Sequence, residues 1–485
     1  MPGALDLPEA GPQLRPDLHH SIMIRRFAIA SLVLPVSLSA QAPARDLTPL
    51  VNRVFARWDS ASAPGCAVGI DRAGAPRFTR AFGSADLEFE IPNTPETIFE
   101  AGSISKQFTA AATVLLALDG KLNLADDVRK YVPELPKYER TITIRHLLNH
   151  TSGLRDWGEI AGLAGWPRGA RAHTHDDVLD ILSRQRAINY PPGDRYSYTN
   201  SGYNLLAIIV SRVSGQPFAT FSNERLFKPL GLKNTQWRDD YRRVVKGRAQ
   251  AYSVRNREWA LEMPFEFVHG NGGLLTTVGD LLDWTAMLER PTPQWKAMAD
   301  SLHMRGVLTK GDTIAYALGL TVENYRGLRF VEHSGATGGY RADLYRFPGR
   351  GLAVAVLCNG ASANPVAYGM QLADSILGPA LGPAAVAQNR PRADSASWRP
   401  TPAELAAFVG SYYSPDVETT LEISVANGQL TLFRRSATRV TLRPTTKDAF
   451  AGFNSRVWFT RDASGRVSAL HVGGGRAYDV VFERR

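Results

Sequence analysis

The strand-like segments of the first 380 or so residues fall into two groups that lie far apart in the chain. The first group is a hairpin pattern, "GCAVGIDRAGAPRFTRAFGSADL", whose turn falls at 72–76. The second begins near Arg329 with "LRFVEHSG", "YRADLYRFP" and "GLAVAVLCNG", and a helical segment, "NPVAYGMQLADSILG", follows it. The long stretch between them is mostly helical in pattern. We therefore predict an α/β (α+β) fold: an antiparallel five-stranded sheet built from both groups, flanked by helices and carrying a large helical insertion.

A second region with a different pattern follows a proline-containing stretch. Residues 382–402, "GPAAVAQNRPRADSASWRPTP", have the composition of a linker. Beyond it, strand-like runs alternate with turns, and Asn427-Gly428 and Ser464-Gly465 are typical hairpin turns. We predict a main domain at 43–381 and a C-terminal all-β, barrel-like domain at 403–485. The second domain has no cluster of polar residues of its own, so we expect it to shape access to a site elsewhere.

The N-terminal 42 residues have the pattern of an export signal. "MIRRFAIASLVLPVSLSA" begins at Met23 and combines two arginines, an apolar run and small residues near its end. We predict a leader at 1–42 that contains a signal peptide, with Met23 as the true start of the protein. This signal directs export to the periplasm or the extracellular space. The apolar run is too short for a permanent membrane helix, and no cysteine follows it for lipidation, so we expect no stable membrane anchor.

Composition excludes two further classes of protein. The net charge is +10, but the arginines are scattered and no basic helix is interleaved with aromatic residues, so we expect no nucleic-acid binding. The chain has only two cysteines, Cys66 and Cys358, which excludes a disulfide-framework domain. From the residues alone, both alternatives stay open: two buried small hydrophobic residues, or one bridge between neighbouring strands.

One short segment combines a serine with a lysine at helical spacing. In "FEAGSISKQF", Ser103 precedes Lys106 by three residues, and no other lysine in the chain has a serine at that position. Residues three apart share a helix face, where a neutral lysine can accept the proton of a serine nucleophile. A serine at the start of a helix also lies at the positive end of its dipole. The alternative is that Ser103 and Lys106 are only the polar first turn of an apolar helix and have no chemical role.

Two further segments add polar groups of the same kind. "PPGDRYSYTNSGYNLL" contains Tyr198 and Asn200, two residues apart in an extended stretch before a helix. "FVEHSGATGGY" contains His333 and Gly335 within a strand, where glycine permits a close approach of another backbone. Each also has a structural interpretation: a packing tyrosine, an N-cap asparagine and a histidine at a strand edge.

Together and in this order, the three motifs resemble those of the serine β-lactamase and penicillin-binding-protein superfamily, S-x-x-K, Y-x-N and H-x-G. The forms found here resemble the class C β-lactamase branch, with its D-aminopeptidase and esterase relatives. Two further segments match sequences typical of this branch, "ITIRHLLNHTSGL" and "GNGGLLTTVGDLLDW". The resemblance runs from about 47 to 377. In the resembling fold, the strand that ends at Cys358 lies beside the one that begins near Cys66, which favours a bond between them.

The resemblance implies catalytic roles for three residues. Ser103 is the nucleophile that becomes acylated. Lys106 and Tyr198 share the proton transfers, with Tyr198 as a phenolate stabilised by the lysine. The implied reaction is a two-step acyl transfer, in which an acyl-enzyme forms on the serine and water then releases it.

The resemblance also implies binding roles. Asn200 hydrogen-bonds the amide side chain of the substrate, and the backbone N–H groups of Ser103 and Ala336 form the oxyanion hole. His333 and Gly335 bind the substrate from their strand, and His333 can donate to a substrate carboxylate or to Tyr198. His333 stands where many relatives carry lysine, and with an unperturbed pKa it is cationic only near or below about pH 6.5.

Competing chemistries have weaker support. His146 and His150 are four residues apart but lack the glutamate of the H-E-x-x-H zinc motif, and His173 and His175 precede a helix as cap neighbours. No G-x-S-x-G, P-loop or dinucleotide motif occurs. We expect no metal and no cofactor. The predicted function is an exported serine hydrolase acting on amide or ester bonds of a small-molecule or peptide substrate: a D-amino-acid peptide, a β-lactam or an ester. The alternative is a penicillin- or peptidoglycan-peptide-binding protein without turnover.

Overall fold

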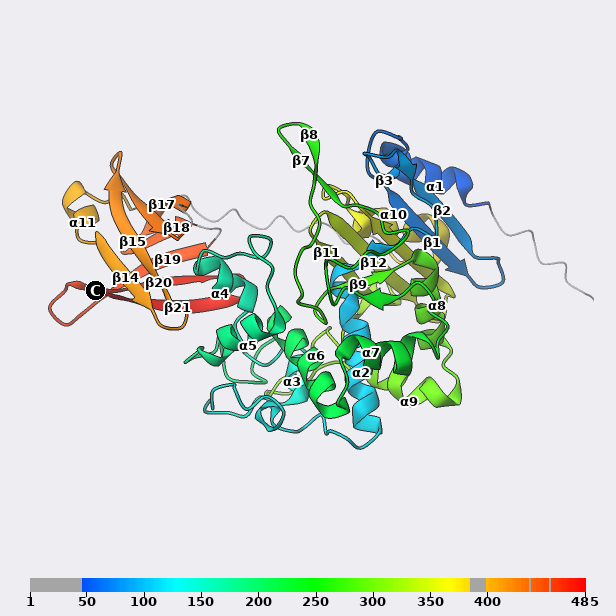
Figure 1. The fold of residues 1–485 in the computed structure, drawn as a ribbon, viewed down its shortest axis with the longest axis horizontal. Helices are drawn as coiled ribbons and strands as arrows, with labels where there is room; N and C mark the ends of the chain where they lie inside the picture. The colour runs from blue at the N-terminus through cyan, green and yellow to red at the C-terminus, as the bar shows by residue number, and fades with distance from the viewer. Residues whose placement is uncertain (1–45, 384–397, 436–437, 453–454) are drawn as a thin grey trace, which may run out of the picture. The chain divides into compact units, whose positions relative to one another are not determined.

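The structure is a computed structural model that describes residues 46–383, 398–435, 438–452 and 455–485 (Figure 1). The predicted leader and signal peptide, and most of the predicted linker, lie outside these residues.

The central sheet joins the two predicted groups of strands, in the order β10-β11-β12-β13-β1-β2 with every neighbouring pair antiparallel. It has one strand more than the sequence pattern indicates, because β10 is a short polar edge strand without a clear apolar alternation. The fold class is confirmed. The strands are β1 (Cys66–Arg72), β2 (Phe78–Phe82), β10 (Thr321–Tyr325), β11 (Leu328–Thr337), β12 (Tyr340–Phe347) and β13 (Leu352–Cys358).

Helices cover both faces of this sheet. On one face, α1 (Thr48–Phe55) and α10 (Pro365–Leu377) pack over the side chains of Val68 and Val356. On the other face, α8 (Val278–Glu289) packs against β1 and β13, and a Cβ atom at Gly69 would lie only 2.8 Å from a methyl carbon of Leu282. Both faces of the central strands are therefore buried.

The insertion between β2 and β10 forms a helical region with small sheets. Its longest helices, α2 and α6, pack against each other, and α6 ends at Gly215 in the left-handed conformation. The helices are α2 (Ser105–Leu118), α3 (Ile144–Leu148), α4 (Trp157–Leu163), α5 (His175–Ser183), α6 (Asn200–Ser214), α7 (Phe218–Ser222) and α9 (Pro293–Leu302). The strands are β3 (Ser84–Asp86), β4 (Ile91–Pro92), β5 (Phe99–Glu100), β6 (Gln236–Trp237), β7 (Tyr252–Arg255), β8 (Glu258–Leu261) and β9 (Leu274–Thr276).

The C-terminal region is a closed antiparallel β-barrel, as predicted, because its first strand also pairs with its last. Asn427 and Gly428 form the turn between the second and third strands with positive φ, as the hairpin signal indicates. A short helix, α11 (Pro402–Ala406), precedes the barrel. The strands are β14 (Gly410–Ser414), β15 (Thr419–Ala426), β16 (Gln429–Arg434), β17 (Thr438–Thr446), β18 (Ala449–Gly452), β19 (Ser455–Arg461), β20 (Val467–Gly474) and β21 (Ala477–Arg484).

A buried ion pair links the barrel to the helical region. Arg155 donates to Asp416 over 2.9 Å, and the two side chains are only 4% and 7% exposed. Gln185 donates to the Asp416 carbonyl as well, over 2.9 Å. Because a buried charge is costly without its partner, this contact fixes the barrel against the insertion.

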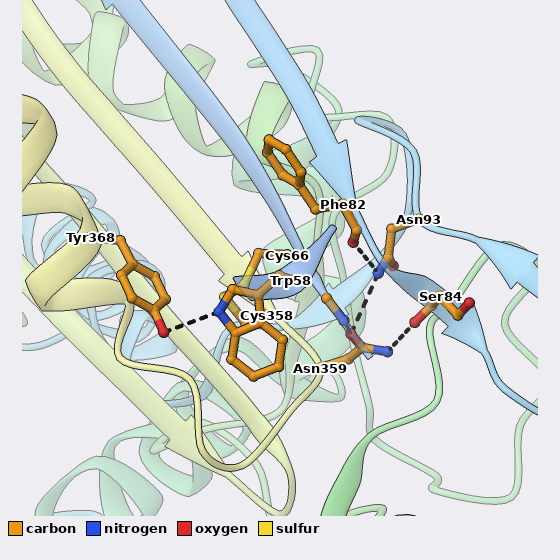
Figure 2. The surroundings of a disulfide bond; sticks show 9 residues. Trp58, Cys66, Phe82, Ser84, Asn93, Cys358, Asn359 and Tyr368 are labelled. Carbon is orange, nitrogen blue, oxygen red and sulfur yellow. Dashed lines mark hydrogen bonds between the residues drawn. A yellow bond between two sulfur atoms is a disulfide. The ribbon is translucent and has the colours of Figure 1, made fainter. Parts of the chain in front are cut away.

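Cys66 and Cys358 lie directly opposite each other on β1 and β13 and form a disulfide (Figure 2). Of the two alternatives that the residues leave open, the structure has the bridge. Beside it, Asn359 accepts from the Gly65 N–H over 2.7 Å and donates to the Ser84 carbonyl over 2.9 Å. The bridge thus joins the start of the first sheet strand to the end of the last one, across the segment that carries the helical insertion.

Reduction of this disulfide is expected to lower the free energy of unfolding by about 2–4 kcal/mol, because the bond closes a segment of 292 residues in the unfolded chain. Urea denaturation with and without reductant measures the difference. Thiol titration of the denatured, unreduced protein serves as the control, and two free thiols would exclude the bond in that preparation.

Candidate active site

Ser103 and Lys106 meet at the start of α2, as their spacing predicts. Ser103 lies in a short 3₁₀ turn, Gly102–Ile104, which runs directly into the helix. Lys106 Nζ lies 3.1 Å from Ser103 Oγ, and its two other hydrogen-bond acceptors are Asn200 Oδ1 at 3.1 Å and the Asn271 carbonyl at 2.6 Å. The lysine side chain is completely buried, whereas Ser103 is partly exposed. The amine is therefore held against the serine by two fixed acceptors.

Burial holds the pKa of Lys106 well below its usual value, and the nearby Arg476 and Arg168 cations lower it further. Asp156 acts in the opposite direction, with the smallest effect of the four. A lysine acts as a base only when it is neutral, and desolvation and neighbouring cations both favour the neutral amine. The environment of Lys106 therefore meets the condition for a proton acceptor.

Tyr198 and Asn200 reach the same place from the start of α6, where Tyr198 precedes the N-cap and Asn200 is the first helical residue. Thr199 caps this helix by accepting from the Ser201 N–H, so Asn200 is not the N-cap and its side chain is available to Lys106. The ring of Tyr198 lies 4.8 Å from Lys106 Nζ. The structure thus brings the first and second motifs together around the lysine.

The phenolate form of Tyr198 is not favoured in this environment. Burial raises the pKa of Tyr198 above its usual value, and this outweighs the lowering by the Ser103 hydroxyl and the Arg476 cation. The Tyr198 hydroxyl is buried and has no hydrogen-bond partner of good geometry among the described residues. A neutral phenol beside Ser103 suits proton relay rather than a role as the resting base.

The third motif lies on β11, close against the serine turn. A Cβ atom at Gly335 would lie 2.0 Å from the Ala101 carbonyl oxygen and 3.0 Å from the Ser103 nitrogen, so only glycine fits. Gly102 has φ +52°, and a Cβ atom there would lie 2.5 Å from the Ala336 nitrogen. The backbones of Ser103 and Ala336 are thus neighbours, which the inferred oxyanion hole requires.

His333 is buried and neutral. Its Nε2 atom lies 3.0 Å from the Tyr316 hydroxyl, and its Nδ1 atom lies 2.6 Å from the Ser334 carbonyl. Burial, with the Lys106 charge as a smaller cause, lowers the pKa of His333 to about 3. The unperturbed value of about 6.5 therefore does not apply in this site, and His333 does not supply a positive charge at neutral pH.

Because His333 stays neutral, its replacement by glutamine is expected to lower kcat/KM without changing the shape of the pH profile between about pH 5 and 8. Glutamine keeps a polar group toward Tyr316 but has no titrating ring. The measurement is kcat/KM against pH for both proteins. A wild-type limb near pH 6.5 that disappears in the His333→Gln variant would contradict the neutral assignment.

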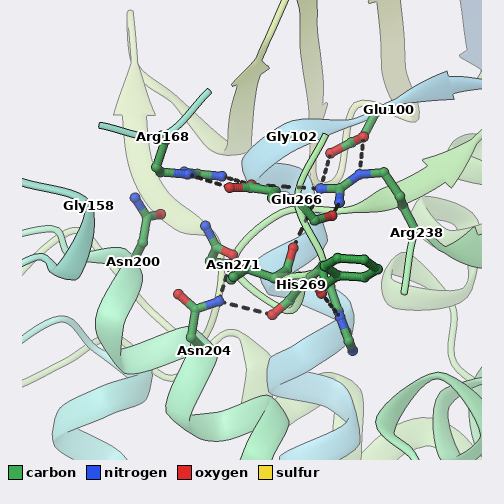
Figure 3. A network of polar contacts seen from close by, with 12 residues as sticks. Glu100, Gly102, Gly158, Arg168, Asn200, Asn204, Arg238, Glu266, His269 and Asn271 are labelled. Atoms are coloured by element: carbon green, nitrogen blue, oxygen red, sulfur yellow. Dashed lines mark hydrogen bonds and ion pairs between the residues drawn. The ribbon is translucent and has the colours of Figure 1, made fainter. Parts of the chain in front are cut away.

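A buried polar network supports the site from behind (Figure 3). Asn204 donates to Asn271 Oδ1 over 2.7 Å, and this holds the segment whose carbonyl accepts from Lys106. Arg238 pairs with Glu100, and both side chains are only 1% exposed. Asn271 lies within "GNGGLLTTVGDLLDW", but no single-sequence pattern indicates its role, because a backbone carbonyl carries no residue signature.

The four histidines of the competing motifs, His146, His150, His173 and His175, make structural hydrogen bonds. His146 forms a capping box with Thr143 at the start of α3, and His150 Nδ1 accepts from the Thr199 N–H. His173 contacts the Trp166 carbonyl, and His175 contacts the His269 backbone. Within the part of the chain that the structure describes, no three His, Cys, Asp or Glu residues are grouped as metal ligands.

A cleft of about 640 Å³ opens over these groups. Ser103, Tyr198, Asn200, His333, Gly335 and Ala336 all line it, so the predicted site residues share one cavity with Lys106 buried beneath them. Arg168, Arg341 and Arg476 also line it, and no Asp or Glu does so among the described residues. These arginines carry no signal in the sequence, because they come from loops and strand ends far apart in the chain.

The family model described as "Beta-lactamase" matches residues 50–377, more than half of the 485-residue chain. Penicillin-binding protein 4* of Bacillus subtilis is 29% identical over 392 residues, which cover 77% of this chain and 84% of the relative. A D-aminopeptidase of Cereibacter sphaeroides is 26% identical over 339 residues, which cover 69% of this chain. The match spans only 63% of the length of that D-aminopeptidase.

Solved structures show the same fold. The octameric penicillin-binding protein homologue from Pyrococcus abyssi has a TM-score of 0.60 at 23% identity, covering 90% of this chain and 99% of its own. The D-amino acid amidase from Ochrobactrum anthropi SV3 has a TM-score of 0.56 at 22% identity, covering 68% of this chain and 97% of its own. With the family match and the three motifs converging on one cleft, the chain belongs to the beta-lactamase family and is a hydrolase of that family.

Proposed function

We propose that this protein cleaves amide or ester bonds through an acyl-enzyme on Ser103. The observation that carries the proposal is the pair formed by Ser103 Oγ and Lys106 Nζ, 3.1 Å apart, with the lysine buried and the serine facing the cleft. A serine hydroxyl is a poor nucleophile by itself, and acyl transfer needs a base in contact with it. The Lys106 amine, with its lowered pKa, can supply that base.

In the first step, neutral Lys106 accepts the proton of Ser103 as its oxygen bonds to the carbonyl carbon of the substrate. The negative charge that develops on the carbonyl oxygen is stabilised by the N–H groups of Ser103 and Ala336. Collapse of the intermediate breaks the bond to the leaving group, which takes up the proton through the Tyr198 hydroxyl. Water then attacks the acyl ester while the same base accepts its proton. The base passes this proton to Ser103 Oγ as the acyl bond breaks, which frees the serine and the acid product.

The substrate classes we propose are D-amino-acid peptides or amides, β-lactams and simple esters. Support comes from the relatives, which include penicillin-binding protein 4*, D-aminopeptidases and a D-amino acid amidase. Asn200 and Gly335 border the cleft where the amide of such a substrate would lie. The neutral state of His333 removes one cation that would hold an anionic substrate on this strand.

We also propose that the protein is exported. The support is the signal-like pattern that begins at Met23, together with the Cys66–Cys358 disulfide, a bond that persists in oxidising compartments. Among the described residues, no helix is long and apolar enough to cross a membrane.

A parallel screen with nitrocefin, p-nitrophenyl acetate and a D-alanyl peptide, followed by intact-protein mass spectrometry, tests the proposed hydrolase. Turnover of any of the three with a transient adduct on Ser103 supports the hydrolase. A stable penicillin adduct without turnover would favour the alternative, a binding protein. The absence of both turnover and an adduct would contradict the proposal.

A further inference from the structure

The hairpin turn between β20 and β21 of the barrel reaches the cleft of the catalytic region. Arg476, in this turn, is held through its backbone: its N–H donates to both oxygens of Glu159, at 3.0 and 2.9 Å. Its carbonyl accepts from the Asp156 N–H over 3.1 Å and from the Asn189 side chain over 3.0 Å. These contacts use only main-chain atoms of Arg476, so they fix the turn and leave the side chain free for another purpose.

That side chain enters the cleft beside the catalytic residues. The Arg476 guanidinium carbon lies 4.8 Å from the centre of the Tyr198 ring, and the residue lines the same cavity as Ser103. The arginine side chain remains 41% exposed. A cation over an aromatic face is held in place by the ring while its outer N–H groups stay open to a ligand.

Among the described residues, Asp156 supplies the one carboxylate within 4 Å of this guanidinium, and Glu159 binds the backbone N–H of Arg476 instead. Asp156 Oδ2 lies 3.9 Å from Arg476 Nη1, beyond hydrogen-bond distance. The same oxygen accepts from the Asn200 N–H over 2.7 Å, and Oδ1 accepts from the Gly158 N–H over 3.0 Å. Asp156 is thus a local cap for α4 and for the Asn200 backbone, and it does not form a close ion pair with Arg476.

The other two arginines of the cleft are more fully engaged. Arg168 pairs with Glu266, which is 6% exposed, and Arg341 donates to the carbonyls of Gly338 and Tyr340 over 2.7 Å each. Among the described residues that line the cleft, Arg476 is therefore the cation with the most donor capacity left for a ligand.

We propose that Arg476 is a substrate-specificity residue that the barrel contributes to the active site, where it binds a carboxylate of the substrate close to the scissile bond. The inference rests on the proposed function, since it names a chemical class within the proposed substrates. It also gives the barrel a defined role, because the barrel hairpin supplies the positive charge that neutral His333 does not. Guanidinium suits a carboxylate because its N–H groups match the two oxygens.

The electrostatics of the site agree with this position. The Arg476 cation contributes to the lowered pKa of Lys106 and opposes the raised pKa of Tyr198. Removal of Arg476 should therefore raise the pKa of Lys106. Since only the neutral amine accepts the serine proton, the acid limb of the pH profile should then move to higher pH.

The experiment compares a matched pair of competitors, N-acetyl-D-alanyl-D-alanine and its C-terminal amide, against hydrolysis of the neutral reporter p-nitrophenyl acetate. The two differ only in the carboxylate. We expect the wild type to bind the acid about tenfold more tightly than the amide, as one partly exposed charged contact allows. The ratio should fall to about one in Arg476→Ala, be partly retained in Arg476→Lys and be inverted in Arg476→Glu.

The control variant is Arg466→Ala. This arginine lies in the β19–β20 turn, at the other end of β20 from Arg476, pairs with Asp462 and is 81% exposed. It should leave the ratio unchanged. Thermal denaturation checks that the Arg476 variants stay folded, which their intact main-chain contacts predict. A wild-type ratio near one, or an Arg476→Ala ratio equal to that of the wild type, would overturn the proposal.

Failure of the proposed function would be distinguishable from failure of this inference. If the wild type neither hydrolyses the reporter nor becomes acylated on Ser103, the hydrolase assignment fails. Direct titration calorimetry with the same acid and amide then still measures the charge preference and its dependence on Arg476. If the reporter is hydrolysed but the ratios do not depend on Arg476, only the specificity role fails.

Discussion

Replacing Ser103 by alanine is expected to reduce kcat/KM by more than about a thousandfold on whichever substrate the wild type turns over. The variant loses the atom that forms the acyl bond in the proposed mechanism, while the proposed base, the proposed oxyanion donors and the cleft remain. Ser103 lies at the open end of the site and its hydroxyl contacts Lys106, so the change creates no core cavity. We expect the melting temperature to stay within a few degrees of the wild-type value.

Two measurements make this result specific. Mass spectrometry should show an adduct on the wild type and none on Ser103→Ala. The matched control is Ser301→Ala, which removes a serine hydroxyl from α9, outside the residues that line the cleft, and should keep wild-type turnover. Undiminished turnover by Ser103→Ala, or an adduct on another residue, would show that the nucleophile is assigned wrongly.

Replacing Lys106 by methionine or alanine is expected to lower kcat/KM by about 10²–10⁴-fold, the range typical for loss of a general base. Methionine nearly preserves the volume of this fully buried side chain, so it separates loss of the base from loss of packing. Arginine keeps the positive charge but does not become neutral, so Lys106→Arg should be as inactive as Lys106→Met.

The pH dependence follows from the direction of the Lys106 shift. The folded-state pKa lies well below 10.5, so the neutral, active form is present above that lowered pKa and is lost as the pH falls through it. The wild type should therefore stay active at pH values well below 10.5. Its activity should decline only where the pH falls through the lowered pKa of Lys106, which gives the acid limb of the profile. A loss of less than about tenfold in Lys106→Met would transfer the base role to Tyr198, and Tyr198→Phe, assayed in parallel, would then show the larger loss.

The local parts of the site could be predicted from the sequence. Ser103 and Lys106 are three residues apart on one turn of helix, and the geometry of a helix brings such residues together in any fold. Tyr198 and Asn200 line one cavity because they are two residues apart on either side of Thr199, the N-cap of α6. The hairpin turns and the closed barrel followed from short-range signals as well.

Only the tertiary structure decided the protonation states of the site residues and the contacts between residues far apart in the chain. The neutral state of His333 and the lowered pKa of Lys106 arise from burial and from neighbouring charges, which no linear spacing reports. The Cys66–Cys358 bond depends on which strands become neighbours in the sheet. Arg476 reaches Tyr198 across more than half of the chain because the barrel hairpin is fastened to Glu159 and Asn189. Helix and hairpin geometry acts over a few residues, whereas desolvation and Coulomb interactions depend on distance in space, and only the packed fold sets that distance.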